Sequence, residues 1–297
     1  MEKELILEAT HLCQTFHMNE HSRVDAVRDV SLTIHRGEVL GLVGESGCGK
    51  STIARLVTGI EQPAAGSVLF EGLPVSGPHA DAVQKKKLHQ KVQLIFQDSA
   101  AALNPRMTVQ KILLEPVHIQ KFKAGKKAAL QKAIHLLAEV GLNETYLSKY
   151  PGELSGGQRQ RVAIARSLML DPELIVADEP ISSLDISIQA QIMMLFLHLR
   201  QERKFSMLFI AHDLSAVRFI SDRVAVMLQG KVVELAPTEE LFQNPLHPYT
   251  RSLLSSIHVP DPVFERNKRS IPYDRTLPLG DTLHEKQPGH FVLEPLH

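Results

Sequence analysis

The segment Gly44-Glu45-Ser46-Gly47-Cys48-Gly49-Lys50-Ser51 decides the fold of this chain. It fits the pattern G-x-x-x-x-G-K-[ST], in which glycines allow backbone N–H groups to curl around a phosphate. The run Val39–Val43 reads as a buried strand directly before it, and a helical pattern from Thr52 to Val57 follows. This order of strand, loop and helix predicts a nucleotide site. The alternative is a glycine-rich turn that opens an ordinary helix.

Two residues of the loop have the clearest chemistry. Lys50 is expected to reach the β- and γ-phosphates, and Ser51 to hold Mg²⁺ through its hydroxyl. Cys48 lies at a helix N-terminus beside Lys50, and both features lower the pKa of a thiol. The candidate nucleotide-binding residues of this segment are Gly44, Glu45, Ser46, Gly47, Cys48, Gly49, Lys50, Ser51 and Thr52.

Composition excludes several classes of protein. Lys+Arg and Asp+Glu are equal at 33 each in 297 residues, so no excess of positive charge favours nucleic acid. Two cysteines, Cys13 and Cys48, argue against a disulfide scaffold. The apolar runs are far shorter than the roughly 20 residues of a membrane helix, and the N-terminus does not resemble a signal peptide. We therefore expect a soluble protein that reaches a membrane only through a partner.

The chain alternates strand-like and helical patterns, which predicts an α/β fold with a mostly parallel core sheet. Further buried strands are expected at Val92–Phe96, Leu174–Ala177 and Met207–Ala211. Turn-rich, period-2 segments before residue 40 and around Gly66–Gly72 predict a small antiparallel β layer.

A helical subdomain is expected at about 105–170. Within it, Leu130, Ile134, Leu137 and Val140 recur at helical spacing, and Gly141 would end that helix. After about residue 245 the composition changes to Pro, His and scattered charge, without clear periodicity.

An acidic pair, Asp178-Glu179, follows one of the predicted buried strands. An aspartate at such a strand end can hold Mg²⁺, and the adjacent glutamate can take a proton from an attacking water. The alternative is a strand end that carries two solvated acids.

Leu154-Ser155-Gly156-Gly157-Gln158 is the second decisive segment. Ser155 is a good N-cap, and a helix N-terminus with a hydroxyl and two glycines favours an anion. Together with the phosphate loop, this pentapeptide resembles the signature of ATP-binding-cassette (ABC) ATPases. The resemblance implies a P-loop NTPase fold of ABC type, with ATP and Mg²⁺ as its ligands.

The resemblance also assigns roles to single residues. It implies that Glu179, His212 and Gln97 are catalytic, with His212 on the γ-phosphate and Gln97 sensing Mg²⁺ and water. It implies that Ser51, Gln97 and Asp178 surround the metal, and that the segment from Asp98 to Val109 contacts a membrane partner. The remaining residues implied for nucleotide binding are Phe16, which would stack on adenine unless it is a core aromatic, Ser155, Gly156, Gly157, Gln158 and Asp185.

In this family the signature closes on ATP that is held by another ATPase subunit. The resemblance therefore implies a second ATPase subunit, related but different, two transmembrane permeases and an extracytoplasmic solute-binding protein, with no nucleic acid. The chain would be peripheral, on the cytoplasmic face of the cell membrane.

A narrower resemblance lies in Phe96-Gln97-Asp98-Ser99, in Leu103-Asn104-Pro105-Arg106, and in Asn244-Pro245-Leu246-His247-Pro248-Tyr249-Thr250. These segments resemble the ATPase subunits of bacterial dipeptide, oligopeptide and nickel importers, as does Gln287-Pro288-Gly289-His290. The resemblance implies an ABC ATPase domain at 1–245 and a short C-terminal extension of oligopeptide-importer type at 246–297. With no cysteine after Cys48, the iron–sulfur cluster of many relatives cannot form in this extension.

The function implied is ATP hydrolysis that energises uptake of di- or oligopeptides. One alternative is the same role in a nickel or metal-chelate importer. A soluble ABC ATPase acting on nucleic acid or ribosomes is disfavoured, because the chain has one cassette and no sustained heptads. His11, Cys13, His17 and His21 lie close together, but their spacing fits no standard metal site.

Overall fold

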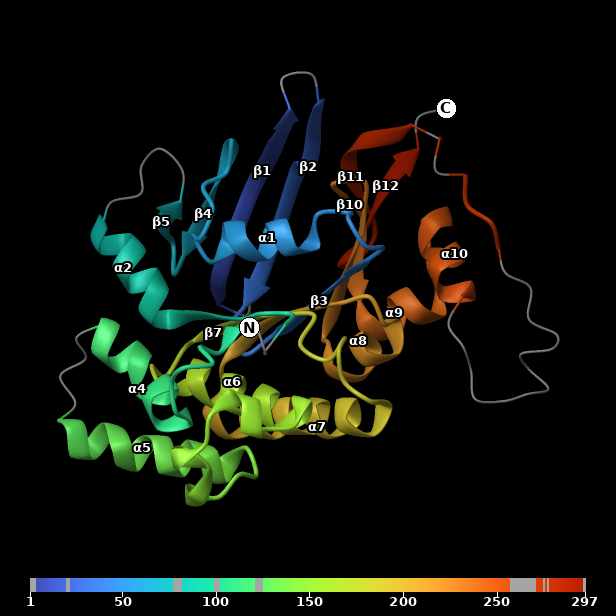
Figure 1. Ribbon diagram of the computed structural model, residues 1–297. Helices are drawn as coiled ribbons and strands as arrows, with labels where there is room; N and C mark the ends of the chain where they lie inside the picture. The colour runs from blue at the N-terminus through green and yellow to red at the C-terminus, as the bar shows by residue number, and fades with distance from the viewer. Residues whose placement is uncertain are drawn as a thin grey trace, which may run out of the picture.

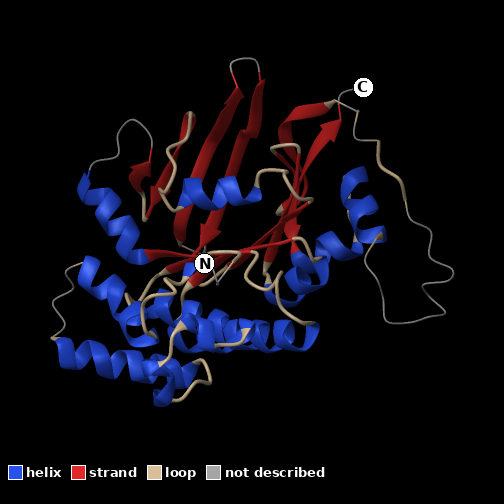
Figure 2. Ribbon diagram, viewed as in Figure 1, coloured by secondary structure: helices blue, strands red, loops and turns tan. Residues whose placement is uncertain are grey.

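Two sheets make up the fold, and the glycine-rich loop follows a strand of the larger one (Figure 1). The structure is a computed structural model that describes residues 4–19, 22–76, 82–98, 102–120, 125–256, 271–274, 276 and 278–295. The smaller sheet stands above the larger one in the view of Figure 2, and most helices lie below or beside the larger sheet.

The larger sheet has eight strands and is mostly parallel, as predicted. Its five parallel strands are followed at one edge by three antiparallel ones. In spatial order the strands are β11 (Leu279–Gln287), β12 (His290–Pro295), β10 (Lys231–Pro237), β9 (Arg223–Leu228), β3 (Val39–Gly44), β8 (Ser206–Ala211), β7 (Leu174–Asp178) and β6 (Val92–Ile95).

The smaller sheet confirms the predicted antiparallel layer. Its strands, in spatial order, are β2 (Ser22–His35), β1 (Leu5–Asn19), β4 (Ala65–Phe70) and β5 (Leu73–Ser76).

The described helices lie in the predicted helical stretches, Thr52–Val57 and about 105–170, and also outside them. They are α1 (Lys50–Val57), α2 (Ala82–Lys91), α4 (Val109–Ile119), α5 (Lys126–Glu139), α6 (Gly156–Leu168), α7 (Ile186–Arg203), α8 (Leu214–Ile220), α9 (Thr238–Gln243) and α10 (Pro248–Ser255), with 3-10 turns at Glu144–Ser148 and Pro151–Glu153.

The central parallel strands β3, β7 and β8 are buried on both faces, which explains why they read as continuous apolar runs. Alternate residues point to opposite faces. In β3, Leu40 and Leu42 pack in one core with α1 and the smaller sheet, whereas Val39 and Val43 pack in a second core with the helices of the other face. Between them, Gly41 allows α8 to lie close, because a Cβ there would come within 2.5 Å of Val217.

The apolar face of α5 differs in part from the predicted one. Leu137 and Val140 are buried as predicted, and Ala129, Ala133 and Leu136 are buried with them, whereas Leu130 and Ile134 are only half-buried. Two alanines lie in this buried face because α5 packs closely against α4 and α6. The predicted end of the helix is confirmed, since Gly141 has a positive φ of 77° directly after the C-cap.

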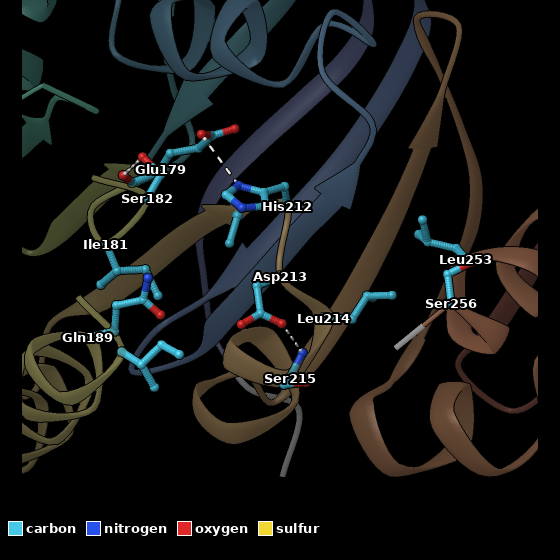
Figure 3. A pocket seen from close by; sticks show the side chains of 12 residues that line it. Glu179, Ile181, Ser182, Gln189, His212, Asp213, Leu214, Ser215, Leu253 and Ser256 are labelled. Carbon is cyan, nitrogen blue, oxygen red and sulfur yellow. Dashed lines mark hydrogen bonds and ion pairs between the residues drawn. The ribbon is translucent and has the colours of Figure 1, made fainter. Parts of the chain in front are cut away.

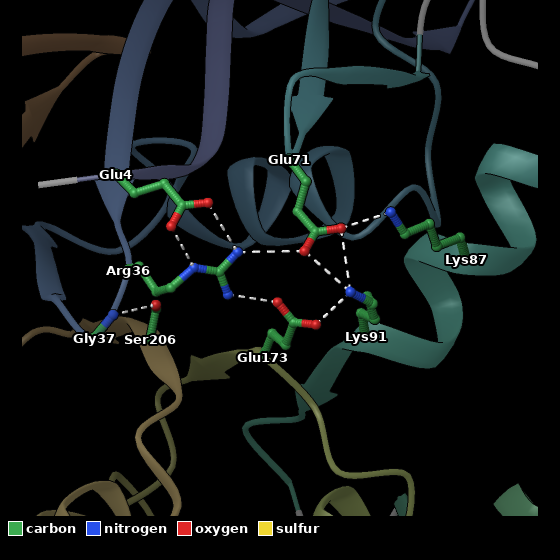
Figure 4. Close-up of polar contacts among 8 residues, drawn as sticks. All are labelled: Glu4, Arg36, Gly37, Glu71, Lys87, Lys91, Glu173 and Ser206. Carbon is green, nitrogen blue, oxygen red and sulfur yellow. Dashed lines mark hydrogen bonds and ion pairs between the residues drawn. The ribbon is translucent and has the colours of Figure 1, made fainter.

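An ion-pair network ties the amino end of the larger sheet to the smaller sheet and to α2 (Figure 4). Arg36 contacts Glu4, Glu71 and Glu173, and Lys91 contacts Glu71 and Glu173. Partial burial disfavours the charge of Glu71, but the hydrogen bonds from Lys87 and Lys91 lower its pKa to about 2. The network lies at the opposite end of the parallel strands from the acidic pair of β7.

The C-terminal segment is more regular than its sequence suggested. Strand β12 pairs with β10, with Glu234 opposite Val292, and β11 pairs with β12. Most side chains of β11 are exposed, so the strand carries no apolar alternation from which to recognise it.

Candidate functional site

The glycine-rich loop connects β3 to α1, as predicted. Gly49 is the N-cap of α1 and has a φ of 107°, and a Cβ on it would lie 2.1 Å from the carbonyl oxygen of Ala26. Only glycine fits there without displacing the backbone of β2. The loop therefore turns tightly and leaves the first amide groups of α1 at its open side.

Lys50 is buried and turns back across this loop. Its Nζ donates to the carbonyl oxygens of Gly44, at 2.8 Å, and of Glu45, at 2.9 Å. Within the described residues no carboxylate forms an ion pair with Lys50. A buried ammonium whose partners are carbonyl dipoles is well suited to a phosphate, because an anion would supply the missing opposite charge.

Ser51 and Asp178 come together although they are far apart in the sequence. Ser51 Oγ donates to Asp178 Oδ1 at 3.1 Å. Burial raises the pKa of Asp178, while the hydrogen bond from Ser51 opposes that rise. The pair thus places a hydroxyl oxygen beside a buried carboxylate that has little access to water. These oxygens suit a divalent cation that prefers oxygen ligands.

Glu179 is held by both its backbone and its carboxylate. It has a φ of 45°, its N–H donates to the carbonyl of Ile210 at 2.9 Å, and its own carbonyl accepts from Ser182 Oγ at 3.1 Å. Its Oε2 accepts from Gln97 Nε2 at 2.9 Å and lies 3.6 Å from Nδ1 of His212. Figure 3 shows the side chains of Glu179 and His212 pointing toward each other, with Ser182 beside Glu179.

The structure therefore gathers the predicted catalytic and metal residues at the carboxyl ends of adjacent parallel strands, where open α/β sheets place ligands. Ser51, Gln97 and Asp178 line one hollow of about 470 Å³. Glu179 and His212 line another, of about 560 Å³. The set brought together is Lys50, Ser51, Gln97, Asp178, Glu179 and His212.

The signature segment is a second, separate element. Ser155 is the N-cap of α6, its Oγ accepts from Gln158 N at 3.3 Å, and Gln158 Oε1 accepts from Ser155 N at 3.0 Å. Gly157 packs against α7, since a Cβ there would lie 2.7 Å from Ile188. Across the described residues, no hydrogen bond or ion pair joins 155–158 to the phosphate loop.

Two other predicted site residues lie apart from this cluster. Asp185 is exposed at the N-cap of α7. Phe16 is half-buried on β1, opposite Val24, and within the described part of the chain no ring contact joins it to the loop. Ile186, the residue after Asp185, lines the hollow that Glu179 and His212 share.

The chemistry expected for Cys48 is wrong. Cys48 is buried, with only 7% of the residue exposed. Burial raises the pKa of Cys48, and this outweighs the lowering by Lys50 and by the backbone of the helix start. The helix end and the lysine are present as predicted, but the thiol points into the core rather than to solvent.

We expect Cys48 to react with iodoacetamide several-fold more slowly than the half-buried Cys13 at neutral pH, because the thiolate is the nucleophile. Peptide mass spectrometry over a time course measures both rates. In denaturant the two rates should converge. Equal rates in the folded protein would contradict the burial of Cys48.

Sequence reasoning missed Ser182 and the end of α10. Ser182 is three residues after Glu179, and that spacing is the signal for a hydroxyl that bonds back to the carbonyl of the glutamate. Leu253 and Ser256 line the hollow beside Glu179 and His212, and no pattern in the sequence indicates this.

The described residues lack two features, a clustered metal-ligand set of His, Cys, Asp or Glu and a helix that could cross a membrane. The described residues contain no group of three or more His, Cys, Asp or Glu that could hold a metal ion. His11 instead pairs with Asp29 at 2.6 Å, and His21 lies outside the described residues. Among the helices of the described chain, none is long and apolar enough to cross a membrane.

Comparison with protein families gives two matches. The family described as ABC transporter matches residues 27–182, and the family described as oligopeptide/dipeptide transporter, C-terminal region, matches residues 233–278.

Similar chains were found among characterised proteins. The oligopeptide transport ATP-binding protein OppF of Bacillus subtilis is 51% identical over 98% of this chain and 96% of its own length. The oligopeptide transport ATP-binding protein AmiF of Streptococcus pneumoniae is 44% identical over 90% of this chain and 88% of its own.

Solved structures share the fold. A dimeric post-hydrolysis state of the ATP-binding cassette MJ0796, bound to ADP and Pi, has a TM-score of 0.71 and 28% identity, covering 78% of this chain and 99% of its own. CbiO1 of Clostridium perfringens, part of the ABC transporter complex cbiONQ, has a TM-score of 0.70 and 28% identity, covering 82% of this chain and 92% of its own.

Proposed function

This chain belongs to the ATP-binding proteins of oligopeptide ABC transporters, and from that premise we infer that it is the ATP-hydrolysing subunit of a bacterial importer of di- or oligopeptides. The observation that carries the site is the cluster of Lys50, the Ser51–Asp178 pair and the Gln97–Glu179–His212 contacts at one end of the sheet. The nickel alternative is not favoured, because the similar proteins are named for oligopeptide transport.

The residues of the cluster have separable tasks. Lys50 and the amides at the start of α1 bind the phosphates of ATP. Ser51, Asp178 and Gln97 would hold Mg²⁺, which would neutralise charge on the β- and γ-phosphates. The wider nucleotide set of Gly44 to Thr52 surrounds the same phosphates.

Glu179 acts as the general base toward the attacking water. Its backbone is in the left-handed region, which costs a non-glycine residue about 1–2 kcal/mol. The hydrogen bond from Glu179 N–H to the carbonyl of Ile210 and the one from Ser182 Oγ to the carbonyl of Glu179 maintain that conformation. Gln97 and His212, which both contact Oε2 of Glu179, would fix the direction of the carboxylate, and His212 would also contact the γ-phosphate.

The separation of the signature from the loop supports a site that is completed by a second subunit. Ser155, Gly156, Gly157 and Gln158 would contact ATP held by the other ATPase, and Asp185 would lie at the contact between the two. We propose a related but different chain as that second ATPase, and adenine stacking on Phe16 in each. The dimeric form of a structural neighbour is consistent with this arrangement.

Membrane permeases are the next partners. A groove of about 460 Å³ lies between β6 and the helices α4 and α6, and exposed apolar side chains of Ile60, Phe96 and Ile119 line it. We propose that one permease docks here and on the neighbouring segment from Asp98 to Val109, of which residues 99–101 lie outside the described residues, and that the second permease docks on the second ATPase. The chain would then sit on the cytoplasmic face of the membrane, with an extracytoplasmic protein supplying the peptide.

The domain division follows the same proposal. Residues 1–245 would form the ATPase domain, with a helical subdomain at about 105–170, and residues 246–297 the C-terminal extension.

We expect the isolated chain to hydrolyse ATP slowly, because it lacks the signature segment of a partner. Titrating in the second ATPase and the permeases should raise the rate per chain. Adding the binding protein loaded with peptide should raise it further, whereas a nickel chelate should not. Steady-state phosphate release measures all three. A rate that is already high in dilute solution and independent of protein concentration would contradict the composite site.

A further inference from the structure

Glu234 is a buried carboxylate on β10 that the ATPase chemistry does not use. It has no exposed surface. Its Oε1 accepts from Leu246 N at 2.7 Å and from His290 Nε2 at 2.7 Å, and its Oε2 accepts from His247 N at 3.0 Å. One carboxylate therefore joins three segments: β10, the chain that enters α10, and the start of β12.

His290 connects this carboxylate to the C-terminal hairpin of β11 and β12. The imidazole is fully buried, and its Nδ1 lies 3.7 Å from Oε1 of Glu240 on α9. From β10, Lys231 Nζ donates to the carbonyl of Gly280 at 2.8 Å and to Asp281 at 2.7 Å, both on β11. The hairpin is thus held to β10 by polar contacts as well as by the pairing of β12.

The His-Pro-Tyr segment forms the other side of the same cluster. His247 is the N-cap of α10, and its Nδ1 accepts from Tyr249 N at 3.1 Å. Burial lowers the pKa of His247 to about 4, against the opposing effect of Glu234, so the ring stays neutral and can accept that bond. Pro248 starts the helix, and Tyr249 is buried against the ring of Tyr273, with centroids 5.5 Å apart.

The far end of α10 reaches the reaction site. Leu253 and Ser256 line the hollow of about 560 Å³ that Glu179 and His212 also line. Figure 3 shows Leu253 and Ser256 on one side of that hollow, across from His212 and Asp213. A shift at the start of α10 would therefore move a wall of the hydrolysis site, because an α-helix transmits displacement along its length as a rigid unit.

We propose that Glu234 and His290 are positioning residues for ATP hydrolysis, which fasten the C-terminal hairpin to the start of α10 and thereby fix the wall formed by Leu253 and Ser256. This inference rests on the proposed ATPase site. The proposal assigns the same role to the His-Pro-Tyr segment and to the Gln287–His290 segment, because His247 N and His290 Nε2 both bond to the carboxylate of Glu234.

The test compares three full-length variants in the assembled transporter. His290→Ala removes the bond to Glu234. His290→Gln retains a donor near the position of Nε2, and His284→Ala changes an exposed histidine on the same hairpin. We expect His290→Ala to lower kcat about tenfold and to leave KM for ATP within about twofold of wild type. A displacement of Leu253 and Ser256 should affect the reaction more than the binding of ATP. His290→Gln should recover most of the rate, and His284→Ala should match wild type.

Hydrogen exchange, measured without nucleotide, tests whether the Glu234–His290 contact fastens the hairpin to α10. In His290→Ala the amides of 246–256 and 279–295 should exchange at least about tenfold faster, with other regions unchanged. Unchanged exchange of these amides would overturn the inference that Glu234 and His290 fasten the hairpin to α10. Faster exchange with wild-type kcat would overturn its link to hydrolysis while leaving the proposed function intact. Loss of that function is recognised separately, since it would appear as a wild-type transporter that does not hydrolyse ATP.

A second pair of variants applies if His290→Ala does not fold. Leu253 lines the hollow, whereas the neighbouring Leu254 packs against the core without lining it. We expect Leu253→Ala to lower kcat and Leu254→Ala to leave it near wild type at equal stability. Equal effects of the two substitutions would overturn the assignment of α10 as a wall of the site.

Discussion

Glu179→Gln is expected to bind ATP with near wild-type affinity and to lose about 10²-fold or more in kcat. Glutamine keeps the size of the side chain and can still meet Gln97 and His212, but it cannot accept a proton from water. The expectation rests on the contacts of Oε2, which lies 2.9 Å from Gln97 Nε2 and 3.6 Å from His212 Nδ1. Single-turnover phosphate release and equilibrium nucleotide binding, measured on the same sample, separate the two effects.

The matched control is Glu239→Gln, the same chemical change at an exposed glutamate that pairs with Arg218 on the surface. It should leave both affinity and turnover unchanged. Because the proposed transporter contains two sites, the base at the partner's site must be inactivated in the same experiment. Hydrolysis at the wild-type rate in that background would remove Glu179 from the mechanism.

The sequence was sufficient to place most of this site, for a physical reason. A parallel strand buried on both faces reads as an unbroken apolar run, and its end is marked by the first polar residue. Asp178 and His212 each follow such a run. Because parallel strands end at one edge, residues that directly follow neighbouring strands lie close together there, as the contacts among Gln97, Glu179 and His212 illustrate.

Other features depended on packing that no local pattern encodes. The thiol of Cys48 could face the phosphates or the core, and only the tertiary structure shows that it is buried. The buried face of α5 includes Ala129 and Ala133, whose small side chains carry little weight in an apolar periodicity. The strand β11 is polar along most of its length, and its position depends on pairing with β12 rather than on burial.

The contacts of the buried carboxylate of Glu234 also could not be predicted from local sequence. In sequence it is a single acid within an apolar strand, 12 and 56 residues from two of its hydrogen-bond partners. A buried acid is stable only when donors surround it, and here the donors come from distant segments. Such residues are found by examining what a structure buries.

Lys50→Ala is expected to weaken ATP binding about 10- to 100-fold, the loss of one charge-assisted contact of about 1.5–3 kcal/mol. The side chain of Lys50 is buried. Within the described residues its Nζ contacts the carbonyl oxygens of Gly44 and Glu45 and, at 3.9 Å, Sγ of Cys48. Its positive charge is thus held in place without a carboxylate to neutralise it. Isothermal titration with a non-hydrolysable ATP analogue and Mg²⁺ measures the affinity directly.

Lys204→Ala is the control, because Lys204 is an exposed lysine at the C-cap of α7, away from the loop. It should bind the analogue like wild type. The fold should survive Lys50→Ala, since the substitution removes a buried charge that costs free energy to desolvate when no phosphate is bound. A thermal midpoint near that of wild type, together with lost affinity, therefore identifies Lys50 as a phosphate ligand. An affinity within about threefold of wild type, a change below about 1 kcal/mol, would contradict the phosphate-loop assignment.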